Sequence, residues 1–537
     1  MTGLVQRAQQ RVKRLVRKWD ADSSARRFMA YCRKKWPWDP KVKYDSVVLM
    51  SYWAHKISMF CNAHTANYLA RRTGSGIETY AIFGGKDARV RRVYESFGAR
   101  LGLDASWAEP DRPELEKQAD EIFHSLKSKW DLLELRIDGL KIGDLVYDSY
   151  LRWFEEPTVK LDDPRLRRLI FESVFIYRAL ANYRKVKRVE ALITDDYSYH
   201  ECGILTRVLM REKVPVYFVC FGSQHFVYRM LEEPETGYHD FPFRWEFHHY
   251  RKLFRSMPEE EQVRCREIGR QHLDRRLSGH IDKMTNMQVS PFGVKTEKVF
   301  PENGRPRIVV LMHDFFDSPH YYRWMLFPDF YEWMLFLFEK ASETEFDWYV
   351  KPHPATWDPA RGSLNRRNVA VTEELLARFP KIKLMPPTVS NLQIVDEGIS
   401  AMFTMYGTAG HEFARLGVPV VNAADNPHIA YPFNYHPTTV EEYADLIQRA
   451  DRLTCSADPE DIAEYVYMNY YYVGDHYGTP ANPLPLSFFD DPNYEVHTSK
   501  PNGYDHLMFP EDPTREAGMK KYYDHYFREH PQKTAAK

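Results

Sequence analysis

The stretch ISAMFTMYGTAGHEFARLGVPVV, residues 399–421, decides the class of fold. Its first six residues form an apolar run with the length of a buried strand, and residues 418–421 predict a second strand after a short helix. Two buried strands joined by a helix make a parallel βαβ unit. We therefore expect an α/β fold with a parallel sheet in this part of the chain.

The same alternation of apolar strands and helices extends over most of the sequence. Expected strands lie at residues 46–50, 79–83, 191–194, 215–220, 307–312, 346–350, 381–385, 399–404 and 418–421, and expected helices at 110–129, 199–211, 331–340 and 440–450. Residues 284–306 lose this periodicity and collect Pro291, Pro301, Gly304 and Pro306, which is typical of a linker. A chain of 537 residues also suits two cores better than one.

These patterns predict an α/β protein with two Rossmann-like domains facing a central cleft. The expected divisions are a basic amphipathic segment at 1–40, an N-terminal domain at 41–290, a C-terminal domain at 305–460, and an aromatic-rich tail at 461–537 that packs back on the body. Ligands of such sheets bind at the carboxyl ends of the strands. The ordinary phosphate motifs are absent: there is no GxGxxG after a first strand, and GGKD at 84–87 lacks the spacing of a P-loop.

Composition excludes several classes of protein. Lys and Arg number 74 against 75 Asp and Glu, so the overall charge of a nucleic-acid-binding protein is missing. The six cysteines are scattered without a CxxC pair, which excludes a disulfide framework or a zinc ribbon and favours a reducing compartment. No apolar stretch reaches the roughly 18 residues of a membrane span. We expect a cytoplasmic protein, at most peripheral to a membrane.

The N-terminal 36 residues depart from this balance. They carry 11 Lys or Arg against two Asp, and apolar residues recur among them at helical spacing. Such a helix could lie on an anionic membrane surface. It could equally pack on the body of the protein with its charged face in water. The sequence leaves both interpretations open.

Residues suited to bind a nucleotide follow two strands of the second domain. Lys351 and His353, in KPHP, come directly after one strand, where a cation and an imidazole can meet a phosphate. Tyr406, Gly407 and Thr408 follow another strand at the expected start of a helix, where small residues let backbone N–H groups approach a phosphate.

Glu412, one turn further along the same helix, can accept hydrogen bonds from ribose hydroxyls. The alternative is that Thr408 and Glu412 form a capping box. A capping box needs a separation of three residues, whereas these two residues are four apart, which favours nucleotide binding.

In combination, KPHP at 351–354 and YGTAGHEFARLGVPVV at 406–421 resemble the nucleotide-binding half of bacterial capsule and lipopolysaccharide glycosyltransferases, most closely the Kdo transferases of capsule assembly. Residues 313–320 and 138–152 also resemble segments of these proteins. The resemblance implies a GT-B fold and a nucleotide-sugar co-substrate without a further cofactor. It implies a glycan or glycolipid acceptor on a growing surface polysaccharide, with Kdo from CMP-Kdo as the first guess for the donor.

The resemblance further implies a carboxylate and a histidine on the acceptor side. Asp195 and Asp196 follow the strand 191–194, Glu201 lies in the same stretch, and His225 follows the next strand, so these groups can share one pocket. In a retaining reaction Asp196 attacks or stabilises the anomeric carbon, and His225 moves a proton. The alternative is that one of the two aspartates caps the following helix.

His313, Asp317 and His320 invite a metal interpretation, which we set aside because GT-B enzymes neutralise the leaving phosphate with side chains and helix dipoles. We expect this segment to line the cleft or to form a capped turn. Two other functions stay open at this stage. A CDP-glycerol or UDP-sugar dependent transferase would use the same fold, and a non-catalytic scaffold would only bind polysaccharide.

Overall fold

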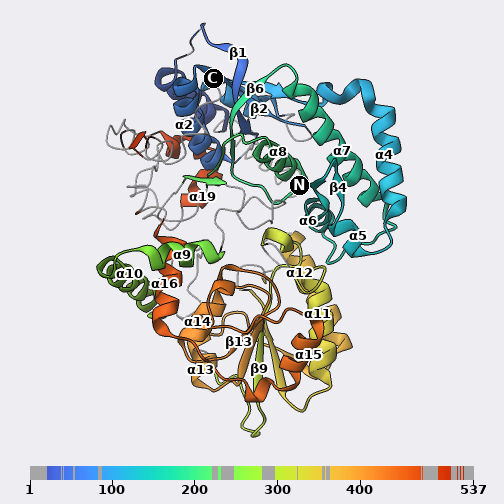
Figure 1. Ribbon diagram of the computed structural model, residues 1–537, viewed down its shortest axis with the longest axis vertical. Helices are drawn as coiled ribbons and strands as arrows, with labels where there is room; N and C mark the ends of the chain where they lie inside the picture. Colours follow the sequence, from blue (N-terminus) through green and yellow to red (C-terminus); the bar gives the residue numbers. More distant parts are fainter. Residues whose placement is uncertain are drawn as a thin grey trace, which may run out of the picture.

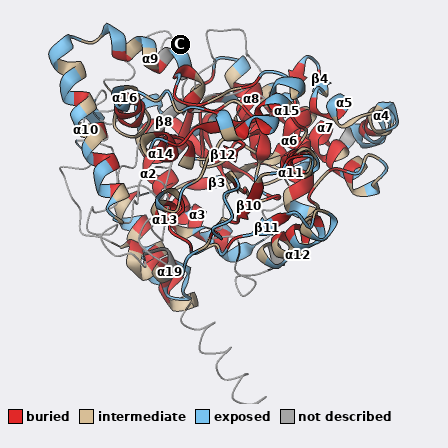
Figure 2. Cartoon of the chain, turned by 90° about the horizontal axis from the view of Figure 1, so that it is seen from below, coloured by how far each residue is buried: buried red, intermediate tan, exposed pale blue. Residues whose placement is uncertain are grey.

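A computed structural model describes most of the chain and shows two lobes, each built around a sheet (Figure 1). The described residues are 21–37, 39, 41–52, 55–82, 87–219, 228–231, 247–280, 297–322, 325–353, 357, 363–472, 475, 494–508, 517, 520, 521 and 524. Buried residues concentrate in the sheets and on the helix faces that cover them (Figure 2).

The N-terminal sheet has six strands in the order β3-β2-β1-β6-β7-β8. The strands are β1 (Lys43–Ser51), β2 (Ser75–Tyr80), β3 (Ala99–Leu103), β6 (Arg188–Thr194), β7 (Val216–Val219) and β8 (Tyr228–Leu231). All neighbouring pairs are parallel except β7 with β8, which is antiparallel. A hairpin of β4 (Arg136–Ile137) and β5 (Leu140–Lys141) stands apart from this sheet.

The C-terminal sheet has five parallel strands in the order β11-β10-β9-β12-β13. Its strands are β9 (Arg307–Leu311), β10 (Asp347–Lys351), β11 (Ile382–Leu384), β12 (Ala401–Thr404) and β13 (Val420–Asn422). The first five strands of each domain therefore share the spatial order 3-2-1-4-5. The strand order reverses between β1 and β6 in one sheet and between β9 and β12 in the other, and such switch points are where open α/β sheets bind ligands.

Helices connect the strands in both domains. The N-terminal domain contains α2 (Lys56–Thr73), α3 (Ala88–Ser96), η1 (Ala105–Asp111), α4 (Arg112–Ser125), α5 (Lys129–Leu133), α6 (Gly143–Phe154), α7 (Pro164–Arg184) and α8 (His200–Arg211). The C-terminal domain contains η3 (Pro319–Tyr321), α11 (Phe330–Ser342), α12 (Ser363–Arg378), α13 (Asn391–Asp396), α14 (Ala409–Arg415), η5 (Pro427–Ala430), α15 (Val440–Gln448) and η6 (Ala450–Arg452). The α/β class and the two Rossmann-like domains predicted from sequence are confirmed.

One predicted strand is misplaced. The sequence predicts a strand at residues 79–83, whereas β2 begins at Ser75 and ends at Tyr80. The early start includes Gly76, where a Cβ atom would lie 2.3 Å from the ring of Tyr44. Only glycine permits this approach to Tyr44, so the strand begins with small residues that an apolar pattern does not reveal.

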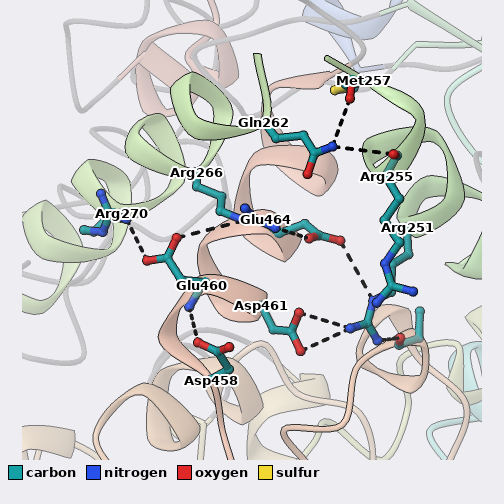
Figure 3. A network of polar contacts seen from close by, with 11 residues as sticks. Arg251, Arg255, Met257, Gln262, Arg266, Arg270, Asp458, Glu460, Asp461 and Glu464 are labelled. Atoms are coloured by element: carbon teal, nitrogen blue, oxygen red, sulfur yellow. Dashed lines mark hydrogen bonds and ion pairs between the residues drawn. The ribbon is translucent and has the colours of Figure 1, made fainter. Parts of the chain in front are cut away.

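Three helices connect the two halves of the molecule. The helices α9 (Phe247–Ser256) and α10 (Glu259–Leu277) precede the linker in sequence, yet they pack beside α16 (Pro459–Tyr470), which follows the C-terminal sheet (Figure 1). Figure 3 shows the polar contacts that join them. Arg251 donates to Asp461 at 3.0 Å, and Arg270 donates to Glu460 at 2.7 Å. The predicted domain 41–290 is thus tied to the second lobe through its last two helices.

The two ends of the described chain lie on the N-terminal domain. Residues 21–35 are helical, and Phe28, in the first core cluster, stacks on Tyr504 at 5.0 Å between ring centroids. Residues 494–507 contain α19 (Tyr494–Ser499) and η7 (Gly503–Leu507), which pack against α2. The part of the basic segment that is described therefore packs on the body, and residues 1–20 lie outside the described residues.

Candidate functional site

Thr404, the last residue of β12, organises the switch point of the C-terminal sheet. Its hydroxyl lies 3.0 Å from Nε2 of His313, which follows β9, and accepts a hydrogen bond from the Gly407 amide at 3.3 Å. A Cβ atom at position 407 would lie 3.0 Å from the same hydroxyl oxygen. The turn after β12 is therefore held close to the turn after β9, and glycine at 407 allows this.

Tyr406 fixes the loop that leaves β9. Its hydroxyl donates to the carbonyl oxygens of Ser318 at 3.4 Å and Pro319 at 3.2 Å, and its ring lies 4.9 Å from that of His313. His313 also stacks on Phe330 at 4.8 Å. Burial lowers the pKa of His313 to about 3, and the neighbouring His353 acts in the same direction, so this imidazole is neutral.

Lys351 ends β10 and is only 4% exposed. Its ammonium donates to the side-chain oxygen of Asn391 at the start of α13. Burial lowers the pKa of Lys351 to about 8, and Glu412 acts in the opposite direction. To meet a phosphate, as the sequence predicts, this ammonium would have to leave Asn391.

His353, two residues further, is half-buried. Burial and then Lys351 lower its pKa, while Asp317 raises it. His353 is thus placed between the C-terminal sheet and the loop that carries Asp317. Its place after β10 puts this imidazole at the same edge of the sheet as the turns after β9 and β12.

Thr408 and Glu412 occupy different environments. Thr408 is exposed and precedes α14 without capping it through its side chain, so the predicted capping-box alternative is wrong. Glu412 is 1% exposed and forms a buried ion pair with Arg276 of α10. Its carboxylate is engaged by Arg276, and a ribose hydroxyl would have to share it.

Asp195 and Asp196 follow β6 at the switch point of the N-terminal sheet. Asp195 lies toward β1, where the Ser51 hydroxyl donates to it at 3.3 Å, and burial raises its pKa to about 7. Asp196 accepts a hydrogen bond from the Ser198 amide at 2.7 Å. Burial raises the pKa of Asp196 to about 6 despite this bond, and Asp317 of the other domain adds to the rise.

Neither aspartate caps the following helix. The N-cap of α8 is Tyr199, and no side-chain bond closes this end of the helix, so the capping alternative is wrong. Glu201, in the first turn of α8, has its pKa raised by burial, with His200 opposing and Glu172 adding to the rise. His225 lies outside the described residues.

The loop after β9 joins the two domains. Tyr199 donates to Asp317 at 3.3 Å, and Tyr197 stacks on Tyr321 at 5.4 Å with an angle of 25° between the rings. Asp317 is exposed, as expected for a residue that lines a site. This contact brings the carboxyl end of the C-terminal sheet against the start of α8, beside Asp196.

His320 lies differently from the prediction. Its Nδ1 is 2.6 Å from Asp148 of α6, and both side chains are buried, so His320 is a domain contact and lines no open site. Next to it, Tyr147 donates to Asp329 at 2.5 Å, and Thr158 donates to the same carboxylate at 2.6 Å. Residues 138–152 are part of the family resemblance, but the sequence alone indicates no role for Asp148. The spacing of Asp144, Asp148 and Arg152 by four residues was the signal that could have indicated a functional helix face.

Within the described ranges, no group of three His, Cys, Asp or Glu side chains is arranged to hold a metal ion. No helix among those residues is both long and apolar enough to cross a membrane. Five of the six cysteines are described, and no disulfide joins any two of them.

No protein-family model matches the sequence, and no curated protein matches it either. Similar solved structures include the UDP-GlcNAc 2-epimerase from Neisseria meningitidis bound to UDP-GlcNAc, with 11% identity, coverage of 79% of this chain and 98% of that chain, and a TM-score of 0.22. The glycosyltransferase VinC in complex with dTDP has 10% identity, coverage of 84% and 99%, and a TM-score of 0.21.

A mutant O-GlcNAc transferase from Thermobaculum terrenum has 12% identity, coverage of 91% and 70%, and a TM-score of 0.18. Scores this low do not bear on the activity of the chain. By its own strand order, the protein has two Rossmann-like domains, and the Tyr199–Asp317 hydrogen bond joins the loops that follow the carboxyl ends of β6 and β9, an arrangement of the GT-B kind.

Proposed function

We propose that this protein is a glycosyltransferase that uses a nucleotide-activated sugar at the contact between its two domains. One observation carries the proposal. The loops that follow β6 and β9 meet at the domain contact, and Asp317 in the second loop lies close enough to both Asp196 and His353 to influence their charges. Gly407 and Thr408 follow β12, the strand beside β9. The hydrogen bond from Tyr199 to Asp317 joins the two sides.

The C-terminal side suits the nucleotide. Backbone amides near Gly407, the exposed Thr408 hydroxyl and the half-buried His353 can all donate hydrogen bonds to phosphate oxygens. The packing of Thr404, His313 and Tyr406 fixes these donors before a ligand arrives, and preorganised donors are what stabilise developing charge on a leaving group.

The N-terminal side suits the sugar, and Asp196 is better placed than Asp195 to act on it. Asp195 is directed toward Ser51 of β1, whereas the charge of Asp317, across the domain contact, raises the pKa of Asp196. In the retaining reaction that we propose, the Asp196 carboxylate forms a bond to the anomeric carbon while the bond from that carbon to the phosphate oxygen breaks. The nucleotide leaves with that electron pair. The acceptor hydroxyl then displaces Asp196 and loses its proton to a base.

For the donor we propose Kdo from CMP-Kdo, with a glycan or glycolipid of a bacterial surface polysaccharide as the acceptor. The support is the resemblance of the segments 351–354, 406–421, 313–320 and 138–152 to capsule Kdo transferases. The structure adds that two of these segments touch, because Asp148 contacts His320. CDP-glycerol and UDP-sugar donors remain outcomes of the test.

The test begins with thermal stabilisation by CMP, CDP, UDP, UMP, GDP and ADP at matched concentrations. A ligand at one hundred times its Kd adds about 2.7 kcal/mol to the free energy of unfolding. We expect CMP to stabilise the protein selectively and CMP-Kdo to be turned over. Selective stabilisation by CDP or UDP would change the donor, and no response to any nucleotide would favour a scaffold without activity.

Two substitutions then locate the nucleotide. His353→Ala and Thr408→Val remove a half-buried and an exposed donor, so the fold should survive while the response to CMP is lost. Thr438→Val is the matched control, because Thr438 is exposed near α15 and its hydroxyl bonds only locally to Glu442. Glu412→Ala is a poor probe since it would leave the Arg276 guanidinium buried without this carboxylate. A full response to CMP in both variants would remove the nucleotide from this site.

A further inference from the structure

Three charged residues, Asp144, Asp148 and Arg152, share one face of α6 at intervals of four residues. Asp144 is buried and accepts two hydrogen bonds from Arg207 of α8, of 2.8 and 2.5 Å. Asp148, one turn further, is buried and paired with His320. Arg152 is the third, and it is half-buried in the last turn of the helix.

Arg152 differs from the other two because its charge has no direct partner. In the part of the chain that the structure describes, its guanidinium makes no hydrogen bond or ion pair and acts on Asp314 and Tyr199 only through its charge. Arginine at such positions commonly binds a carboxylate or phosphate through two parallel hydrogen bonds.

The surroundings of Arg152 place it at the proposed active site. Burial raises the pKa of Asp314 in the loop after β9, and Arg152 is close enough to oppose that rise. The same holds for Tyr199, whose pKa is raised first by burial and then by Asp317, with Arg152 acting in the opposite direction. Arg152 therefore lies near the Tyr199–Asp317 contact.

The end of α6 is held rigidly in this position. The hydroxyl of Ser149 accepts a hydrogen bond from the His200 amide at 3.0 Å, and the ring of Trp153 lies 4.5 Å from that of His200. Together with the Asp148–His320 pair, these contacts fix the last two turns of α6 against both α8 and the loop after β9. A cation that is fixed before the ligand arrives loses little entropy on binding.

We propose that Arg152 binds a carboxylate of the sugar substrate. The inference rests on the proposed function and deepens it by naming a residue that selects acidic sugars. The donors suited to the nucleotide phosphates belong to the C-terminal domain, whereas Arg152 belongs to the N-terminal domain, beside the sugar. Asp196 and Asp317 would repel an acidic sugar at this contact, so binding one requires a cation, and Arg152 supplies it.

The test compares free Kdo with its methyl ester, each titrated into protein saturated with CMP. The acid and the ester differ in charge at one carboxyl group. We expect the wild-type protein to bind the acid at least about 10-fold more tightly, because a hydrogen-bonded ion pair contributes about 1.5–3 kcal/mol. Arg152→Gln should bind both ligands with the affinity of the ester, and Arg152→Lys should recover part of the difference.

Arg178→Gln is the matched control, since Arg178 forms a surface ion pair with Asp138 on the same domain and should behave as wild type. Equal binding of acid and ester by the wild-type protein would overturn the proposal. The proposal would also be overturned if Arg152→Gln lost as much affinity for CMP as for the sugar acid, because that result would assign the guanidinium to the nucleotide phosphate. KM values for donor and acceptor then show which substrate carries the carboxylate.

The two proposals fail separately. If CMP does not bind, the same titration is run with Kdo and its ester alone. A preference for the acid that Arg152→Gln abolishes would support the carboxylate site in a protein that is not a transferase. Binding of CMP with no effect of Arg152→Gln would retain the transferase and reject the carboxylate site.

Discussion

The Asp148–His320 contact offers the sharpest test of how the domains are held together. Burial raises the pKa of Asp148 to about 6. Burial alone would lower the pKa of His320, but the carboxylate 2.6 Å away outweighs it, so the pKa of His320 rises. Near neutral pH the pair is thus a carboxylate and an imidazolium, both buried at the junction of α6 with η3.

Removing one member should leave the other charge buried without its partner, which costs about 3–5 kcal/mol. We expect Asp148→Ala and His320→Ala each to lower the Tm by about 6–20 °C, taking roughly 2–4 °C per kcal/mol for a domain of this size. Replacing both by an apolar pair, Asp148→Leu with His320→Phe, should cost less than the sum of the single changes.

The assay is calorimetric unfolding at pH 7, with Glu134→Gln as the control. That substitution breaks the Lys141–Glu134 bridge, whose carboxylate is 63% exposed, and should cost less than about 1 kcal/mol. The reasoning fails if the single variants at Asp148 and His320 have the same Tm as the control. It also fails if the double variant loses as much unfolding free energy as the two single variants together. Either result would show that the pair does not fix the domains.

Three further outcomes follow from the site. Asp196→Asn should reduce the turnover of sugar transfer at least about 100-fold with little change in CMP affinity. If Asp195→Asn instead loses this much turnover while Asp196→Asn keeps it, the roles of the two aspartates are reversed. Because Asp196 must be ionised to attack, kcat should rise with pH through about 6, its raised pKa, and a flat profile from pH 5 to 8 would exclude that role. The pKa of Asp195 in the folded protein is about 7, above its usual value, so its stabilising contribution is present at acid pH and is lost as the pH rises through 7. Asp195→Asn should therefore be more stable than wild type at pH 8, by on the order of 1–3 kcal/mol in the free energy of unfolding, and no more stable at pH 4. Denaturant unfolding at the two pH values measures this difference.

The fold could be predicted from sequence wherever strands are uninterrupted apolar runs. β1, β6, β7 and four strands of the C-terminal sheet, β9, β10, β12 and β13, carry such runs, whereas β11 has the sequence IKL, which Lys383 interrupts. β3 was missed because its sequence, ARLGL, contains an arginine and a glycine. That glycine lies against Glu78, where a Cβ atom would approach the side chain to 2.2 Å, so the local packing and not hydrophobicity determines the residue.

The site could be predicted only in part. Residues that follow strands, such as Asp196, His313 and His353, were found because parallel strands end at one edge. Partners from distant segments were not, because Arg276 with Glu412 and Asp148 with His320 are separated by 136 and 172 residues. For the same reason the sequence could not show that Lys351 bonds to Asn391 or that His320 is buried.

The path of α9 and α10 determines how this molecule can be divided. A cut in the linker would separate α10 from α16 and leave the Arg276 and Glu412 charges in different fragments, each exposed or buried without its partner. Neither fragment would fold independently, so expression of the isolated halves should yield insoluble protein. A donor-binding fragment that folds independently would have to include residues 247–277 as well as the C-terminal sheet and α16. Residues 247–277 would have to be fused to that fragment without the rest of the N-terminal domain. Exchange of domains between related enzymes would meet the same requirement, and such chimeras should be designed around this helical pair instead of the linker.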